Sequence, residues 1–175
     1  MTSYKLRLAW YVLHTKSRFE NVVYEGLLKK SLDTFLPKIQ VKSKRRDRHI
    51  MINVPLFPGY LFVNTNLIPQ NHLEVVKTTG AVRLLGNKDG PLSVPDETIN
   101  SLKIMVSCPE PLSTGSRFKK GDKVIVISGH LTGVTGIFQQ YRGKGRVIVH
   151  IEALQQFAAV NVDEQNVEKL PEILS

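Results

Sequence analysis

The side chains of this chain that could do chemistry are mainly positively charged, and their spacing supports contact with phosphate groups. The densest group is "KSKRRDR" at 42–48, which contains Lys42, Lys44, Arg45, Arg46 and Arg48. Closely spaced Lys and Arg side chains can contact several phosphates of a nucleic acid at once. The alternative is a solvated loop that only aids solubility.

Two further basic clusters support the same chemistry. One contains Lys16, Arg18, Lys29 and Lys30, at the two ends of the first predicted helix. The other is "YRGKGR", with Tyr141, Arg142, Lys144 and Arg146 on a predicted turn. An aromatic ring beside three bases suits phosphate contact and base stacking on RNA. For both clusters the alternative is ordinary solvent-exposed surface.

Residue patterns for catalysis or metal binding are missing from the sequence. The histidines, at 14, 49, 72, 130 and 150, follow no metal-binding spacing, and the single cysteine, Cys108, cannot form an internal disulfide. The glycines of 128–136 lack the Lys-Ser/Thr of a phosphate loop. We therefore expect a protein that is not an enzyme and has no cofactor.

Charge and composition favour a polyanionic partner. The 175 residues carry 24 Lys/Arg against 15 Asp/Glu, a net charge of +9. Residues 1–106 hold 16 of these bases against 8 acids, so the excess lies mainly there. Such a balance is typical of nucleic-acid-binding proteins. No apolar run approaches a membrane span, and the opening residues lack a signal-peptide pattern, so we expect a cytoplasmic protein without a membrane partner.

The elements that position these residues can be read from hydrophobic periodicity. A strand is predicted at 9–14, followed by a helix within 15–32 with a Ser17–Glu20 capping box. The apolar stripe predicted for this helix consists of Phe19, Val22, Val23, Leu27 and Leu28. Two β-prone arms, 34–42 and 48–54, predict a hairpin whose tip is the basic segment 42–48.

The following segment, "PLFPGYLFVNT" at 55–65, predicts a strand with a bend at Pro58-Gly59. Helices at 68–79 and 95–106, with a strand at 81–86 between them, complete a compact α+β domain with an antiparallel sheet flanked by helices. Residues 107–117 lack periodicity and predict a linker. From 118 to 175, short β-runs separated by glycines predict a small β-barrel.

This layout resembles the NusG family of transcription elongation factors. The resemblance rests on "WYVLHTK", "PLFPGYLFV" and "FKKGDKVIVISGHLTGVTGIF", and it covers essentially the whole chain. It implies an NGN-type N-terminal domain at 1–106, a linker at 107–117 and an SH3-like KOW barrel at 118–175. It also implies a monomer without catalytic residues.

The resemblance implies a partner for the apolar stretch at 55–65. In the family, the N-terminal domain presents an apolar depression to the clamp helices of the largest RNA polymerase subunit. The positions that match are His14, Phe57, Tyr60, Phe62 and Leu85, while Asn71 and His72 match contacts to the opposite lobe of the polymerase. The alternative is that these rings are simply buried core.

Within the family, the chain resembles specialised paralogues of the RfaH, LoaP and UpxY type, which suppress pausing or termination on particular operons. Their contacts to non-template DNA match Lys16, Lys29, Lys30, Thr78 and Thr79, with departures at Gly26 and Thr79. The KOW module implies nascent RNA, Rho or a ribosomal protein as second partner. Two alternatives stay open, a general NusG that acts on all genes and a ribosome-associated RNA-binding protein.

Overall fold

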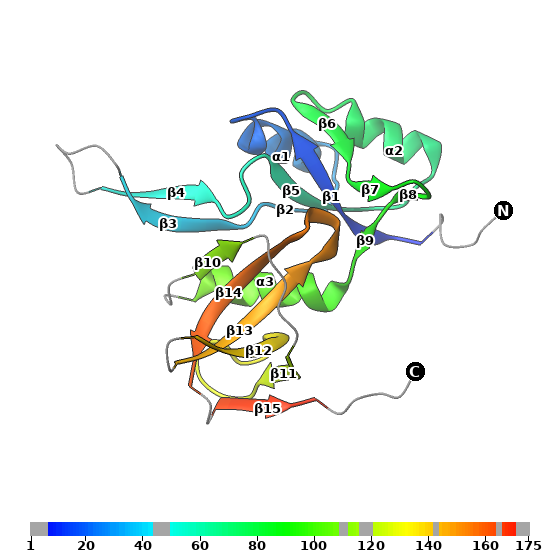
Figure 1. Cartoon of the computed structure of the whole chain (residues 1–175). Helices are drawn as coiled ribbons and strands as arrows, with labels where there is room; N and C mark the ends of the chain where they lie inside the picture. Colours follow the sequence, from blue (N-terminus) through cyan, green and yellow to red (C-terminus); the bar gives the residue numbers. More distant parts are fainter. Residues whose placement is uncertain are drawn as a thin grey trace. The chain divides into compact units, whose positions relative to one another are not determined.

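The computed structural model describes residues 7–43, 50–108, 112–115, 121–141, 144–163 and 166–170. The chain divides into two compact units, Met1–Val94 and Pro95–Ser175. Each unit contains an antiparallel sheet of its own (Figure 1). Within the described ranges, no helix has both the length and the apolar character needed to cross a membrane.

The first unit is built on a sheet of five strands. These are β1 (Ala9–Thr15), β2 (Thr34–Phe35), β5 (Tyr60–Thr65), β6 (Ala81–Leu84) and β9 (Ser93–Val94). β1 is central, because it pairs with β5 along one side and with β6 and β9 along the other. β2 extends the sheet beyond β5. The predicted strands at 9–14 and 81–86 are confirmed by β1 and β6, whereas only Tyr60–Thr65 of the strand predicted at 55–65 is a strand of this sheet.

The two faces of this sheet differ in what covers them. Alternate residues of a strand point to opposite faces. The helices α1 (Glu20–Lys29) and α2 (Pro69–Val76) cover one face (Figure 1), which we call the helix-covered face. Its buried cluster includes Tyr11, Leu13, Leu61 and Val63 from the strands, Val23 and Leu27 from α1 and Val75 from α2. The opposite face, which we call the second face, carries Trp10, Val12, His14, Tyr60 and Phe62.

The start of α1 differs from the sequence expectation. The helix begins at Glu20 with Phe19 as its N-cap, and no side chain caps it. Ser17 lies two residues before the N-cap, and Arg18 between them has a left-handed φ of 65°, which is not helical. The predicted Ser17–Glu20 capping box is wrong. The predicted apolar stripe is right only for Val23 and Leu27. Its other members, Phe19, Val22 and Leu28, are 37–46% exposed.

Two small hairpins are attached to the first unit. β3 (Lys38–Lys42) pairs with β4 (Met51–Pro55), which confirms the predicted hairpin. The first predicted arm, 34–42, is too long, because Thr34–Phe35 pairs with β5 instead. The tip residues Lys44, Arg45, Arg46 and Arg48 lie outside the described residues. β7 (Gly86–Asn87) and β8 (Gly90–Pro91) form the second hairpin. The sequence analysis missed this hairpin and β9, because strands of two residues show no periodicity.

The second unit combines a helix with a sheet of six strands. The helix is α3 (Asp96–Ser107), as predicted. The strands, in spatial order, are β10 (Leu112–Gly115), β14 (Gln156–Val162), β13 (Lys144–Ile151), β12 (Thr135–Tyr141), β11 (Lys123–Val126) and β15 (Val167–Lys169). A short 3-10 helix, η2 (Glu152–Leu154), joins β13 to β14. Among the described residues β10 and β15 do not pair, so the predicted closed barrel is not confirmed.

The division between the units differs from the boundaries expected from the sequence. The sequence analysis placed 95–106 in the first domain, whereas α3 contacts β12 and β13 and clusters with the second unit. Within the predicted linker at 107–117, Leu112–Gly115 pairs with β14 as an edge strand. That the N-terminal domain ends at residue 106 and folds independently stays a prediction.

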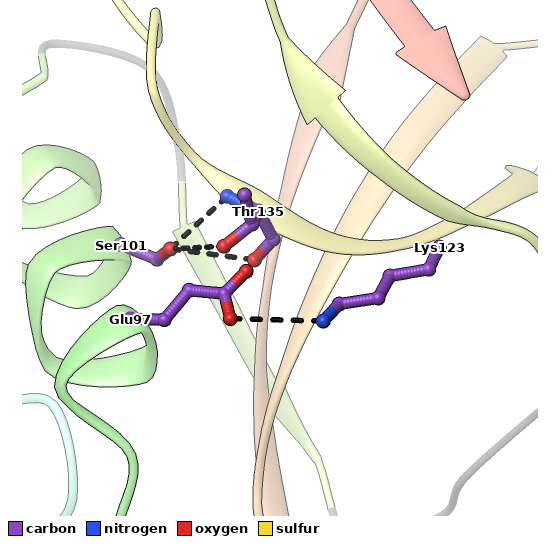
Figure 2. A network of polar contacts seen from close by, with 4 residues as sticks. All are labelled: Glu97, Ser101, Lys123 and Thr135. Atoms are coloured by element: carbon purple, nitrogen blue, oxygen red, sulfur yellow. Dashed lines mark hydrogen bonds and ion pairs between the residues drawn. The ribbon is translucent and has the colours of Figure 1, made fainter. Parts of the chain in front are cut away.

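A buried serine connects α3 to the sheet of the second unit (Figure 2). Ser101 is 1% exposed, and its Oγ accepts a hydrogen bond of 3.0 Å from the backbone N–H of Thr135, the first residue of β12. The same Oγ lies 3.3 Å from the carbonyl oxygen and 3.2 Å from the hydroxyl of Thr135. Beside this contact, Lys123 Nζ lies 3.6 Å from a carboxylate oxygen of Glu97, and both side chains are about half exposed.

These two polar contacts should contribute unequally to stability. Ser101→Ala leaves the Thr135 N–H without its acceptor, so we expect a loss of about 1–3 kcal/mol. Lys123→Ala removes only an exposed ion pair and should cost less than about 1 kcal/mol. Hydrogen exchange on peptides covering β12 and β13 measures both effects. Equal exchange in the two variants would contradict the assignment of Ser101 as the main contact.

Candidate partner-binding surface

The Pro58-Gly59 bend is held in one conformation by three hydrogen bonds, one of which goes to a buried carboxylate. Gly59 has a φ of +83°, a left-handed conformation that glycine adopts without strain. Its N–H donates to Oε1 of Glu20 at 2.7 Å, and its carbonyl accepts from the N–H of Thr15 at 2.8 Å. The Tyr60 N–H donates to the Phe57 carbonyl at 3.1 Å, which closes the turn. The bend is therefore tied both to α1 and to β1.

This bend places Tyr60 opposite His14 on the second face. The two residues are partners in the register of β1 and β5, and their rings stack with centroids 5.2 Å apart and planes inclined by 29°. Both side chains are partly exposed. Aromatic rings with one buried side and one open side are the residues that supply most binding energy in interfaces. The structure thus brings together two of the predicted polymerase-binding residues.

Phe57 and Phe62 do not share this exposure. Both are completely buried, and their rings meet edge to face with centroids 6.2 Å apart. Phe62 also stacks on Phe35 of β2, at 5.9 Å. The expectation that these two rings face outward is wrong. They support the bend from inside, because Phe57 precedes it and Phe62 lies two residues beyond Tyr60 on the same face.

The remaining predicted polymerase contacts are divided between two surfaces. Leu85 is partly exposed, and its N–H donates to the carbonyl of Val12 at 2.8 Å, so it lies against β1. Asn71 and His72 are partly exposed in α2, where the Asn71 amide donates to Oδ1 of Asn66 at 2.7 Å. Because α2 covers the helix-covered face, these two residues do not join the His14–Tyr60 pair in one patch.

The predicted DNA contacts gather around the turn that follows α2. The Lys16 N–H donates to the Gly80 carbonyl at 2.8 Å, which brings Lys16 beside this turn. Lys30 Nζ donates to the Glu74 carbonyl at 2.7 Å and to the Thr78 hydroxyl at 2.9 Å. Lys16, Lys29 and Thr79 are exposed. The structure therefore brings most of this set together.

Within that set, Thr78 is buried and takes part in hydrogen bonds inside the protein. Its side chain is 5% exposed, and its hydroxyl donates to the Glu74 carbonyl while it accepts from Lys30. Thr78 is thus not exposed for contact with a nucleic acid in this structure. Gly26 of α1 lies against the same threonine. A Cβ at position 26 would lie 2.8 Å from Cγ2 of Thr78, so the close approach favours glycine there.

The basic cluster of the second unit is described only in part. Tyr141 and Lys144 pair across β12 and β13, while Arg142 lies outside the described residues. Arg146 is partly exposed and lies between Gln139 and Asn161 in the sheet register. At the other end of β12, Gly129 and Gly133 lie in the turn after β11, with φ values of +85° and +90°, whereas Gly136 lies within β12.

The described residues also include one pocket and two groups with shifted pKa values. A pocket of about 390 Å³ in the second unit is lined by Lys103, Ile104, Ser107, Cys108 and His130, none of which the sequence analysis assigned to a site. No group of three His, Cys, Asp or Glu side chains suited to a metal ion occurs in the described part of the chain. Burial raises the pKa of the Tyr11 phenol and lowers the pKa of the His150 imidazole.

Glu20 is a determinant of the site that the sequence did not indicate. Glu20 is 7% exposed and belongs to the first turn of α1, yet its carboxylate binds a residue 39 positions away. The Ser-x-x-Glu pattern indicated a local capping role instead. No local signal could have indicated Gly59 as the partner, because the contact depends on how α1 packs across the sheet.

Removal of this carboxylate should destabilise the first unit. In Glu20→Ala the Gly59 N–H loses a charged acceptor, so we expect a loss of about 1–3 kcal/mol in the free energy of unfolding. Glu25→Ala, an exposed change on the same helix, should stay within about 0.5 kcal/mol of the parent. Urea unfolding followed by fluorescence of Trp10, the single tryptophan, measures both. Equal midpoints would show that the bend does not depend on Glu20.

Comparisons with known proteins bear on the first unit and on the whole chain. A family model described as "Transcription termination factor nusG" matches residues 8–103. The Transcription termination/antitermination protein NusG of Streptococcus pyogenes is 30% identical over 140 residues, which cover 73% of this chain and 77% of the relative. The protein of the same name from Rickettsia bellii is 22% identical over 170 residues, covering 91% and 89% of the two chains.

A solved structure shows the same fold. The structure titled "Domain interaction in Thermotoga maritima NusG" matches with a TM-score of 0.53 and 22% identity. The match covers 95% of this chain and 99% of that one. The similarity therefore extends over both units, and at this identity it concerns the fold.

Proposed function

Because the chain belongs to the NusG family of transcription factors, we propose that it is an elongation factor that binds RNA polymerase and suppresses pausing and termination. The observation that carries this proposal is the stacked His14–Tyr60 pair beside the rigid Pro58-Gly59 bend. The pair is partly exposed, as is Phe35 of β2, whereas the rings of Trp10, Tyr11 and Phe62 in the same sheet are buried. The family match spans every residue of this surface.

The polymerase would contact His14, Tyr60 and Leu85. A partner helix that covers the exposed sides of the two rings buries aromatic area without reorganising the protein, because stacking and the bend already fix both rings. Phe57 and Phe62 would contribute indirectly, because they are buried on either side of Tyr60 in the chain and pack against one another. Asn71 and His72, on α2, would contact the opposite lobe of the polymerase. The chemistry of transcription remains the polymerase's own.

Upstream or non-template DNA would lie along the turn after α2. Lys16, Lys29 and Thr79 are exposed there and could contact phosphates. Lys30 uses two of its hydrogen-bond donors on Glu74 and Thr78, so its contribution to DNA binding is mainly the charge of its ammonium group. The basic segment 42–48, at the end of the β3–β4 hairpin, would add further phosphate contacts.

The second unit would bind another partner as a KOW-type domain, closed into a barrel. Nascent RNA, Rho or a ribosomal protein are the candidates, and the basic group at 141–146 favours RNA. The protein would act as a monomer in the cytoplasm, associated with the nucleoid through the polymerase. No enzymatic step is needed for this function.

Truncation of Tyr60 tests the polymerase contact. We expect Tyr60→Ala to weaken binding to purified core RNA polymerase by more than about 30-fold, since central interface aromatics typically contribute at least 2 kcal/mol. Tyr60→Phe keeps the ring and should bind nearly normally. Leu28→Ala, which truncates an apolar side chain 45% exposed on α1, is the matched control. Biolayer interferometry measures all three, and wild-type binding by Tyr60→Ala would refute the proposed contact.

Two ranges of action are compatible with this function. The sequence resemblance favours an operon-specific antiterminator, and the alternative is a general NusG that acts on all genes. Genome-wide mapping of the protein on DNA separates them. We expect occupancy confined to one or a few operons, beginning near their promoters. Occupancy that follows polymerase over all transcribed genes would establish the general factor instead.

A further inference from the structure

Three side chains form a row across the solvent-exposed end of the second face. His14 of β1 is opposite Tyr60 in the register with β5, and it is opposite Arg83 in the register with β6. Residues directly opposite one another in antiparallel strands project from the same face. Tyr60, His14 and Arg83 therefore form a row across three neighbouring strands, with the basic residue at the end of the row.

A bulge in β6 shapes this end of the row. His14 pairs with Arg83 while Thr15 pairs with Ala81, so Val82 is an extra residue in β6. A bulge bends its strand and changes the direction of nearby side chains, and it is frequent beside functional sites. Val82 is 45% exposed and Arg83 is exposed as well. The bulge thus leaves an apolar and a basic side chain open beside the stacked rings.

Among the described residues, no carboxylate forms an ion pair with the Arg83 guanidinium. The ion pair found there joins Lys123 to Glu97 in the second unit. A guanidinium presents its donors as a planar fork that matches a carboxylate in a bidentate pair. Lys16, also exposed, follows β1 directly after Thr15. The open end of the second face is therefore positively charged and should attract an acidic partner.

We propose that Arg83 is a specificity-determining residue of the polymerase contact, which pairs with an acidic side chain on an amphipathic helix seated across His14 and Tyr60. This inference rests on the proposed function. The row spans two inter-strand spacings, about 10 Å. Two turns of an α-helix rise about 11 Å. An apolar residue of the partner helix on Tyr60 would thus place a residue two turns away over Arg83.

A nucleic acid fits the same row less well. His14 and Tyr60 stack on one another, so the facing sides of both rings are already covered. Stacking of successive bases on a protein needs open ring faces. The ring surface that stays exposed, together with the exposed side chain of Val82, favours apolar side chains of a protein helix. The acidic helix is therefore the occupant that the observed geometry favours.

Charge reversal at Arg83 tests the proposal with purified core RNA polymerase as the probe. We expect Arg83→Glu to weaken binding more than tenfold, and Arg83→Gln to weaken it less, because it removes the charge without adding repulsion. The loss should shrink at high salt. Lys88→Glu, an exposed residue in the β7–β8 turn with the same change in charge, should bind like the parent protein. Circular dichroism checks that every variant is folded.

The outcomes separate this inference from the proposed function. If Tyr60→Ala loses binding and Arg83→Glu binds like the parent, the role of Arg83 is overturned while the proposed function stands. If both variants bind like the parent, the proposed function fails and the inference fails with it. If Arg83→Glu loses binding only to a single-stranded oligonucleotide, the row is a nucleic-acid site and the proposal is overturned. Restored binding of Arg83→Glu to a polymerase with a reversed acidic clamp-helix residue would establish the pair.

Discussion

The hydrogen bond from the Gly59 N–H to the buried carboxylate of Glu20 is the interaction on which the candidate surface depends. It connects the first turn of α1 to a bend between two strands, and the Thr15 N–H holds the other side of the same glycine. A buried charge is costly unless it is hydrogen-bonded, so this carboxylate strongly disfavours any other conformation of the bend. Tyr60 follows immediately and starts β5 in register with His14.

The second face shows how one sheet surface can be core at one end and exposed at the other. Trp10, Val12 and Phe62 are buried, whereas Tyr60 and His14 are only partly covered and Arg83 is exposed. Buried rings fix the exposed ones, since Phe57 and Phe62 fill the space around the bend. A rigid aromatic surface loses little conformational entropy when a partner covers it. The apolar stretch at 55–65 thus serves both packing and recognition.

Positive charge in the first unit has two different uses. Lys30 reaches the last turn of α2, where backbone carbonyls lack helical partners and a cation is favourable. Its contact with Thr78 holds the two helices together. Lys16, Lys29 and Arg83 are exposed and remain open for ligands. Residue type alone could not separate these uses, because the sequence presents all four as similar basic side chains.

The sequence by itself determined the family, the helices and the longer strands, because hydrophobic periodicity and turn residues are local signals. Through the family resemblance it assigned His14 and Tyr60 to one surface, and the structure shows these two residues as partly exposed neighbours. Only the tertiary structure decided that Phe57, Phe62 and Thr78 are buried, that Glu20 binds Gly59, and that Arg83 lies beside His14. Burial and strand register depend on contacts between residues far apart in the chain, and a one-residue bulge such as that at Val82 reverses which side chains share a face.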